Sequence, residues 1–276
     1  MKCDETRIFR DIEVPADKLP GYRIVKIDCC GEDMYLYVLL PDGTFEGSRP
    51  CVLQFHGFPG FVKNQDLAQA LRRIGCVVVL PFHRGAWGSG GTYSFTHLIE
   101  DAHVVANWVR SPEIVSEYKI DVERIILAGH SMGCHTALNA VKKMPWVRAL
   151  VLMAPYDLSY AFRTDRREEL INLLKAGSIL KVDSETALLT DATQHQAEYA
   201  FETAFDAVKD KPLLLIGGSE DTLAPAADMI DPLWQKLCDH GTTAEQKYFL
   251  YPTTHGLDSH RNTVIREVCH FVSECV

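Results

Sequence analysis

The feature that most constrains this chain is a serine flanked by glycines where the hydrophobic pattern changes. Residues 129–133 read Gly-His-Ser-Met-Gly, so a glycine lies two positions from Ser131 on each side. An apolar run that includes β-branched residues precedes this segment at 124–128, and a helix-forming run follows at 136–141. This pattern between a strand and a helix predicts a nucleophile elbow, a tight turn that holds a serine hydroxyl at the edge of a sheet.

The turn is expected to be tight enough to strain the backbone of Ser131. A Cβ atom at position 129 or 133 would strike the neighbouring strand or helix, which explains why Gly129 and Gly133 are glycines. Because the strained turn lifts the hydroxyl clear of the sheet, a substrate carbonyl can reach it.

Length, charge and cysteine content limit the class of protein. The 276 residues fit one large domain with room for a small insertion. A net charge of −9 argues against nucleic acid or an anionic membrane surface as the main partner. We expect no membrane span and no signal segment, because no apolar run is long enough. The nine cysteines are scattered without metal-ligand spacing, which predicts reduced thiols, a cytoplasmic location and no metal site.

The order of apolar runs predicts an antiparallel start and then alternating strands and helices. Three strands are expected near the beginning, at 6–14, 22–30 and 34–40, separated by turns that contain glycine or proline. Short apolar strands then alternate with helices, which predicts an α/β fold with a mostly parallel sheet covered on both faces. The later strands are expected at 51–55, 76–80, 125–128, 149–153, 212–216 and 247–250, and the helices at 66–74, 95–109, 131–143, 226–238 and 258–275.

One segment, residues 157–210, interrupts this alternation. It contains polar or amphipathic helical stretches, at 163–169 and 194–208, and little that resembles a strand. We expect an inserted helical cap over the edge of the sheet where the strands end. The predicted organisation is a core formed by residues 1–156 and 211–276, with residues 157–210 as the cap.

Two later residues complete a set that can activate the Ser131 hydroxyl. A serine nucleophile needs a base, the base needs an orienting acid, and the chain order after an elbow is serine, acid, histidine. Asp221 follows the predicted strand at 212–216, and His255 follows the one at 247–250. Since parallel strands end at a common edge, we expect Ser131 as nucleophile, His255 as base and Asp221 as acid to meet there.

Each assignment has an alternative. Asp221 could instead cap the helix that follows it. Asp157, after another predicted strand, and Glu220, beside Asp221, are rival acids. His260 is a rival base, although its place in the last predicted helix favours a surface role. His130 is expected to pack beside the site rather than to act as the base.

Two backbone N–H groups are candidates for binding an oxyanion. Met132 follows the nucleophile and begins a helix, so its N–H faces the reacting carbonyl. The second donor is expected from the glycine-containing loop at 56–60, where Phe58 is the best candidate because Pro59 has no N–H. A tight turn that merely returns the chain is the alternative for this loop.

A further glycine-rich stretch, residues 84–91, does not predict a cofactor site. Its glycine spacing differs from the dinucleotide fingerprint, and no segment of the chain matches a phosphate-binding P-loop. Trp87 is expected to pack in a structural loop, with a place at the substrate edge as the alternative. No metal or organic cofactor is expected.

These motifs resemble those of serine hydrolases of the α/β-hydrolase superfamily. Within it, the chain is similar to feruloyl-type carboxylesterases and serine aminopeptidase-like hydrolases. The resemblance covers roughly residues 20–275 and is carried by 56–60, 84–85, 129–133, Asp221 and His255. It implies an eight-stranded, mostly parallel sheet, a cap in place of 157–210, the triad Ser131, Asp221 and His255, and an oxyanion hole formed by the Phe58 and Met132 amides. Cys134 departs from the pattern, since many relatives have glycine there, but its small side chain should fit.

The resemblance implies hydrolysis of a small-molecule carboxylic ester through an acyl-enzyme on Ser131. Dehalogenases and dienelactone hydrolases of the superfamily use Asp or Cys as nucleophile, so Ser131 argues against both. An aminopeptidase, an amidase or an acyltransferase would use the same triad, and a non-catalytic ligand-binding protein could use the same scaffold. A peptidase would need acidic groups for the substrate's amino terminus. The predicted cap offers Asp165, Glu168, Glu169, Asp183 and Glu185, although acids of this kind more often form a solvated face.

Overall fold

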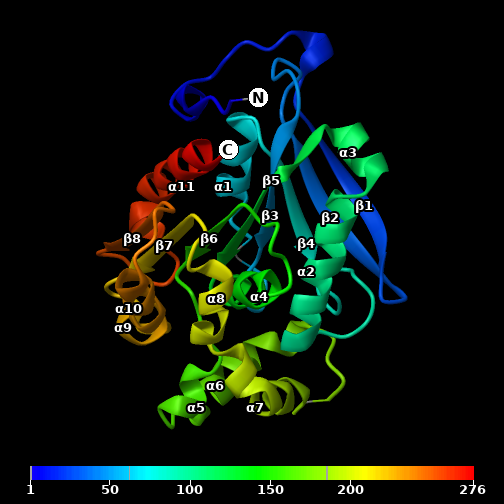
Figure 1. Cartoon of the computed structure of the whole chain (residues 1–276). Helices are drawn as coiled ribbons and strands as arrows, with labels where there is room; N and C mark the ends of the chain where they lie inside the picture. Colours follow the sequence, from blue (N-terminus) through cyan, green and yellow to red (C-terminus); the bar gives the residue numbers. More distant parts are fainter. Residues whose placement is uncertain (1, 62, 185) are drawn as a thin grey trace.

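The apolar runs of the sequence form the central strands of one eight-stranded sheet. In the computed structural model, which describes residues 2–61, 63–184 and 186–276, the strand order is β1-β2-β4-β3-β5-β6-β7-β8 (Figure 1). β2 is antiparallel to β1 and β4, and the remaining neighbours are parallel. The α/β class and the mostly parallel sheet are therefore confirmed. The strands are β1 Gly21–Cys29, β2 Glu32–Leu40, β3 Arg49–Phe55, β4 Val77–Phe82, β5 Ile120–His130, β6 Ala149–Met153, β7 Leu213–Gly218 and β8 Gln246–Tyr251.

The strand expected at 6–14 is wrong. A short 3-10 helix, Glu5–Ile8, begins after Asp4, whose side chain accepts a backbone N–H of its first turn. Arg73 on the first α-helix then donates to the backbone carbonyls of Arg7 and Arg10. The cap and the arginine thus occupy backbone groups that a strand would need for pairing.

Helices cover both faces of the sheet. One face carries α2 and α4, which contact each other, and the other carries α1 and α11, which also contact each other. Among the described residues, no helix combines the length and the apolarity needed to cross a membrane. The helices outside the inserted segment are α1 Gln65–Arg73, α2 Phe95–Val109, α3 Pro112–Tyr118, α4 Met132–Val141, α9 Ala226–Met229, α10 Asp231–His240 and α11 Arg261–Cys275.

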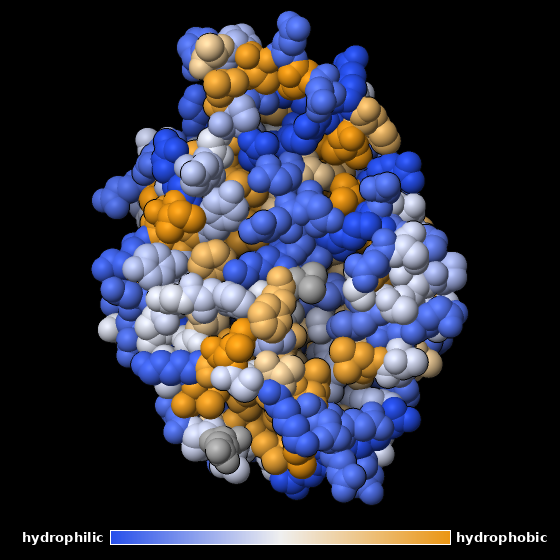
Figure 2. Space-filling model, turned by 180° about the vertical axis from the view of Figure 1, so that it is seen from behind, coloured by the Kyte–Doolittle hydropathy of each residue, from blue (hydrophilic) through white to orange (hydrophobic). Residues whose placement is uncertain are grey.

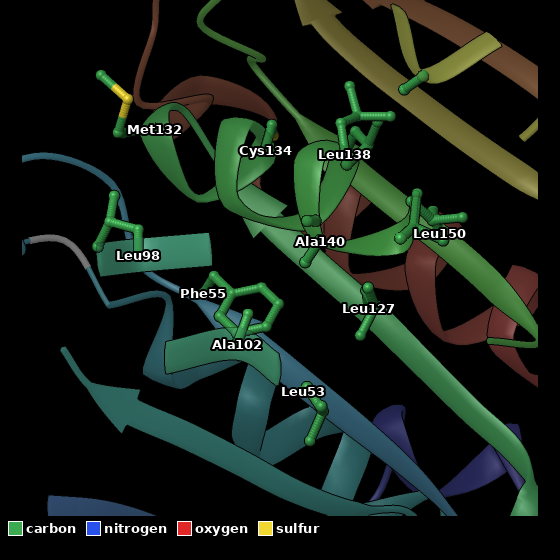
Figure 3. Packing of buried hydrophobic residues seen from close by; sticks show 14 of the residues in the cluster. Leu53, Phe55, Leu98, Ala102, Leu127, Met132, Cys134, Leu138, Ala140 and Leu150 are labelled. Carbon is green, nitrogen blue, oxygen red and sulfur yellow. The ribbon is translucent and has the colours of Figure 1, made fainter. Parts of the chain in front are cut away.

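The core beneath α4 fixes the position of the predicted nucleophile. Leu53 and Phe55 of β3 and Leu127 of β5 lie against α4 in a cluster from which water is excluded (Figure 3). Leu138 of α4 and Leu98 of α2 close this cluster from the helix side. Burial of each such side chain contributes about 1.5–3 kcal/mol, so the packing holds the beginning of α4 firmly over the sheet.

The segment between β6 and β7 is helical in the structure, and most of it lies at the lower end of the molecule in Figure 1. Both helical stretches expected there are interrupted. Asp165, with φ of 57°, separates two helices within 163–169, and the helix expected at 194–208 ends at Tyr199. The elements are α5 Tyr160–Arg163, α6 Arg167–Leu174, a 3-10 helix Lys175–Ile179, α7 Ala187–Tyr199, a 3-10 helix Phe201–Ala204 and α8 Phe205–Val208. Glu185 lies outside the described residues.

The hydrophobicity of the surface at the back of the molecule varies from one end to the other. Figure 2 shows mainly hydrophilic side chains across the middle of that face, and apolar side chains gathered both at its upper end and in its lower part. That lower part is the end of the molecule where α5, α6 and α7 lie in Figure 1. The inserted segment therefore lies at one of the two ends of this surface where apolar side chains gather.

A buried carboxylate ties the loop after β4 to α2. Asp101 of α2 is fully buried and accepts hydrogen bonds from the Arg84 side chain, the His83 ring and the Cys29 thiol. Burial alone would raise the pKa of Asp101, but the hydrogen bond and charge of His83, together with Arg84, outweigh it and lower that pKa to about 2. This cluster was not among the residues predicted from the sequence. An aspartate on the apolar face of α2 was the signal for it.

Replacement of Asp101 tests how much this cluster stabilises the fold. Asp101→Ala should lower the free energy of unfolding by about 3–5 kcal/mol, because it leaves the His83 ring and Arg84 Nε buried without their acceptor, even though Arg84 keeps its ion pair with Glu100. The measurement is urea unfolding followed by circular dichroism. The matched control is Asp33→Ala, which removes an exposed ion pair with Lys26 at 2.9 Å and should cost less than about 1 kcal/mol. Equal losses in the two variants would contradict this account.

Candidate active site

The turn expected at Ser131 is present between β5 and α4. Ser131 has φ of 55° and ψ of −119°, a strained conformation for a residue with a side chain. A Cβ added to Gly129 would lie 2.4 Å from the carbonyl carbon of Gly133, and one added to Gly133 would lie 2.2 Å from the Phe55 carbonyl oxygen. Both distances are far below van der Waals contact, so only glycine allows α4 to approach β3 and β5 this closely.

Hydrogen bonds to β6 hold the turn in place. The Ser131 N–H donates to the Met153 carbonyl oxygen at 2.9 Å, and the Cys134 thiol donates to the same oxygen at 3.4 Å. Cys134 is fully buried in the first turn of α4. A cysteine at this position therefore fits the elbow and adds a contact that glycine could not make.

The three candidate catalytic side chains meet at the edge where the parallel strands end. His255 Nε2 lies 2.8 Å from Ser131 Oγ, and His255 Nδ1 lies 2.7 Å from Asp221 Oδ2. An ionised carboxylate can only accept, so Nδ1 carries the proton and Nε2 is left to accept from the Ser131 hydroxyl. The side chain of Asp221 is fully buried, whereas that of His255 remains partly accessible.

Asp221 also organises its own turn, as the helix-capping alternative suggested. Its Oδ1 accepts the backbone N–H groups of Leu223 at 3.0 Å and Ala224 at 2.8 Å, while Oδ2 is bound to His255. The two roles use different oxygens and are compatible. The turn therefore fixes the direction in which the carboxylate faces His255.

The rival residues lie in other environments. Asp157 binds Arg163 at 2.8 Å and the backbone N–H of Ser159, while the Glu220 side chain accepts from Ser219. His260 stacks on the ring of Tyr251 at the beginning of α11. None of the three has a hydrogen bond to Ser131 or His255 among the described residues.

His130 supports the site through the backbone of His255. Its Nε2 lies 3.0 Å from the His255 carbonyl oxygen, and the two rings are 5.3 Å apart. Burial, followed by the nearby charge of His255, lowers the pKa of His130 to about 4. The ring is therefore neutral near pH 7 and can donate through Nε2, which packs it beside the site as expected.

The two backbone groups expected to bind an oxyanion belong to residues that line the same cavity as Ser131. Met132 is the first residue of α4, and Phe58 lies in the loop after β3. Among the described residues, neither N–H group has a hydrogen-bond acceptor. Gly57 allows the loop to come this close, because a Cβ there would lie 3.1 Å from Ser131 Cβ.

A cavity of about 180 Å³ opens over these groups. Besides the Ser131 and His255 side chains, it is bounded by Phe58 and Met132 and by three residues that the sequence analysis missed. These are Phe61, Leu173 and Leu223. Leu173 belongs to α6 of the inserted segment, and no local pattern distinguished it from the other apolar residues there.

The remaining expectations from the sequence concern the position of Trp87 and the binding of a metal ion. Trp87 does not line the cavity; its ring packs edge-on against Phe61, with centroids 5.4 Å apart, and Lys63 lies over its face. Within the described part of the chain, no three His, Cys, Asp or Glu side chains are grouped as they would be to hold a metal ion.

Three buried histidines should make the fold sensitive to mild acid. Burial lowers the pKa of His56 and His135 to about 3, and that of His130 to about 4, from an ordinary value of 6.5. Between pH 6.5 and 4 the unfolded chain binds protons at these residues and the folded chain does not. The free energy of unfolding should therefore be highest above pH 6.5 and should fall as the pH decreases, by on the order of 1 kcal/mol per histidine for each pH unit.

Urea unfolding at several pH values between about 7.5 and 4.5 measures this slope. His135→Asn should make the slope shallower than that of the wild type, because it removes one of the three buried rings. The same slope in the two proteins would show that the ring of His135 is not held neutral by burial.

Comparison with known proteins places this geometry in a family. A sequence model of the family described as serine aminopeptidase, S33, matches residues 47–200, more than half of the chain. A Mycoplasma pneumoniae protein named as an esterase/lipase is 27% identical over 151 residues, which are 44% of this chain and 55% of that protein. An uncharacterized protein of Mycobacterium tuberculosis is 34% identical over 115 residues, 41% of this chain and 38% of that protein. The matched regions thus span about half or less of these curated relatives.

Solved structures show the same fold at low sequence identity. Est1E from Butyrivibrio proteoclasticus, solved with bound ferulic acid, has a TM-score of 0.69 and 19% identity, covering 91% of this chain and 98% of that one. A puromycin-hydrolyzing peptidase of Mycobacterium tuberculosis has a TM-score of 0.69 and 17% identity, and the match covers 95% of this chain and 40% of that one. The match over residues 47–200 and the shared fold lead to one conclusion: this chain belongs to the serine aminopeptidase (S33) family of α/β hydrolases.

Proposed function

We propose that this protein is a serine hydrolase that cleaves a carboxylic ester of a small molecule. The observation that carries the proposal is the continuous chain of hydrogen bonds from Asp221 through His255 to Ser131, with distances of 2.7 and 2.8 Å. A serine hydroxyl in this arrangement can lose its proton as it attacks a carbonyl carbon.

The reaction proceeds in two acyl-transfer steps. Ser131 Oγ attacks the ester carbonyl while His255 Nε2 takes its proton, and Asp221 stabilises the resulting imidazolium. The C–O bond of the ester then breaks, the alcohol leaves with the proton from His255, and an acyl group remains on Ser131. Water, deprotonated by His255, attacks this acyl-enzyme, and the carboxylic acid is released as Ser131 regains its proton.

Two backbone donors lower the barrier of both steps. The Met132 and Phe58 N–H groups are proposed to bind the negative oxygen that forms when Ser131, or later water, attacks the carbonyl. They are built into α4 and the loop after β3, so they need no reorganisation during the reaction. Each donor of this kind typically contributes about 3–4 kcal/mol to stabilisation of the transition state.

The inserted segment, residues 157–210, is proposed to act as a cap on this site. Leu173 of α6 bounds the cavity next to Ser131. Gly177, in the 3-10 helix that follows, lies so close to the Phe58 ring that a Cβ there would be 2.5 Å from its Cζ atom. The insertion therefore contacts both the cavity and the loop that carries one oxyanion donor.

A reducing compartment, the cytoplasm, is proposed as the location. All nine cysteines are free, and seven of them are buried. The Sγ atoms of Cys3 and Cys76 are 4.0 Å apart, twice the length of a disulfide bond of about 2 Å.

Labelling with a fluorophosphonate, combined with hydrolysis of p-nitrophenyl esters, tests the proposed activity. Ser131→Ala should abolish labelling and, like His255→Ala, lower kcat by about 10⁶-fold. Asp221→Asn should lower kcat by about 10⁴-fold, because His255 would lose its orientation and the partner of its charge. Glu220→Gln, one residue from Asp221 and exposed, is the matched control and should behave as the wild type.

Two results would contradict the proposal. Labelling and hydrolysis that survive in Ser131→Ala would mean that another group is the nucleophile. A folded wild-type protein that is neither labelled nor active on any ester, but binds such esters, would instead be a ligand-binding protein on a hydrolase scaffold.

Acyl transfer in place of hydrolysis would appear as an ester or amide product when an alcohol or amine is added.

A further inference from the structure

The cavity at Ser131 is small for a ligand site. Its volume is about 180 Å³, below the about 300–1,000 Å³ that is usual for pockets that hold drug-sized ligands. In another protein an apolar cavity of about 150 Å³ binds benzene. A single ring or a short alkyl chain therefore fills this space, and a long acyl chain does not fit within it.

The lining is apolar apart from the Ser131 and His255 side chains and the neutral ring of His130. Phe58, Met132 and Leu173 line the cavity, and so do Phe61 and Leu223, which are 64% and 42% exposed. Large apolar side chains with this much exposure can gain buried area when a ligand enters. The lining thus favours a substrate whose groups near the scissile bond are uncharged and apolar.

No carboxylate is available for a substrate ammonium group within the described part of this cavity. Asp221 is fully buried, and its oxygens are already bound to His255 and to two backbone N–H groups. The acids expected in the cap do not line the cavity and are exposed: Asp165, Glu168, Glu169 and Asp183. A charged amine placed here would lose water without gaining a partner, which costs several kcal/mol.

One lining residue comes from the inserted segment rather than from the elements that carry the reacting groups. Phe58 and Met132 carry the proposed oxyanion donors, and the Phe58 ring is held between Tyr93 and Phe95, with centroids 5.9 and 6.5 Å away. Leu173, by contrast, comes from α6 of the inserted segment, is half-buried, and has no part in the hydrogen bonds of the site. Its side chain can be shortened without disturbing the triad.

From these observations, and on the basis of the proposed function, we propose a substrate class. The site takes esters whose acyl group is small, uncharged and apolar, up to about the size of one ring, and it excludes acyl groups with a free α-amino group. Leu173 is the residue that sets the size limit. The substrate class therefore differs from the one that the family's name describes.

The size limit is tested with p-nitrophenyl esters of increasing chain length, together with the benzoate. The wild type should show the highest kcat/KM for chains of about two to four carbons and a loss of at least tenfold by about eight. Leu173→Ala should raise kcat/KM for the eight-carbon ester relative to the acetate by about tenfold. Leu174→Ala is the matched control, because Leu174 is the next residue of α6, is equally half-buried in the same core cluster, and does not line the cavity.

The charge limit is tested with two esters that differ by one group, ethyl isobutyrate and alanine ethyl ester, in which an ammonium replaces a methyl. The wild type should hydrolyse the isobutyrate with at least a hundredfold higher kcat/KM than the alanine ester. Leu173→Asp, which introduces a carboxylate at the cavity, should narrow this ratio by about tenfold. Because each ratio is measured within one variant, partial loss of folded protein cancels.

The outcomes separate this inference from the proposed function. Suppose that hydrolysis depends on Ser131 but the alanine ester is the better substrate: the proposed substrate class is then wrong and the proposed function stands. The same conclusion follows if Leu173→Ala and Leu174→Ala both have the chain-length profile of the wild type. If hydrolysis of these esters is unaffected in Ser131→Ala, the proposed function falls and the substrate class falls with it.

Discussion

Ser131 is held at φ of 55° and ψ of −119° between β5 and α4, and the missing Cβ atoms of Gly129 and Gly133 make this turn possible. A side chain at either position would strike backbone atoms and push α4 away from β3. The Met132 N–H would then move away from the Phe58 loop, and Ser131 Oγ from His255. Strain of this kind costs about 1–3 kcal/mol, which the apolar cluster beneath α4 offsets by burial.

Burial also sets the charge state around the proposed nucleophile. His130 is kept neutral by its apolar surroundings, while Asp221 is buried with a hydrogen bond for each oxygen. Of the two histidines that line the described part of the cavity, His130 is kept neutral, so His255 is the one proposed to receive and return a proton at Nε2. The same apolar surroundings that favour proton transfer along this path disfavour charged substrates.

The sequence was sufficient to predict the central strands, because parallel strands buried on both faces must be continuous apolar runs. The meeting of Ser131, Asp221 and His255 followed from their shared position after strand ends. The strand at 6–14 was wrong because Asp4 caps a helical turn and a distant arginine, Arg73, binds the backbone there. Leu173 could not be found, because its place at the cavity depends on how the insertion folds back over the sheet, which no local pattern encodes.

The most direct test of this account is to trap the acyl-enzyme. The protein is mixed with a slowly hydrolysed p-nitrophenyl ester, quenched in acid within the first turnover, and its mass and proteolytic peptides are measured. We predict one added acyl group per chain, on the peptide that contains Ser131. This adduct should decay with time in the wild type and should be absent in Ser131→Ala. Hydrolysis without any adduct, or an adduct on another residue that turns over at the rate of hydrolysis, would contradict it.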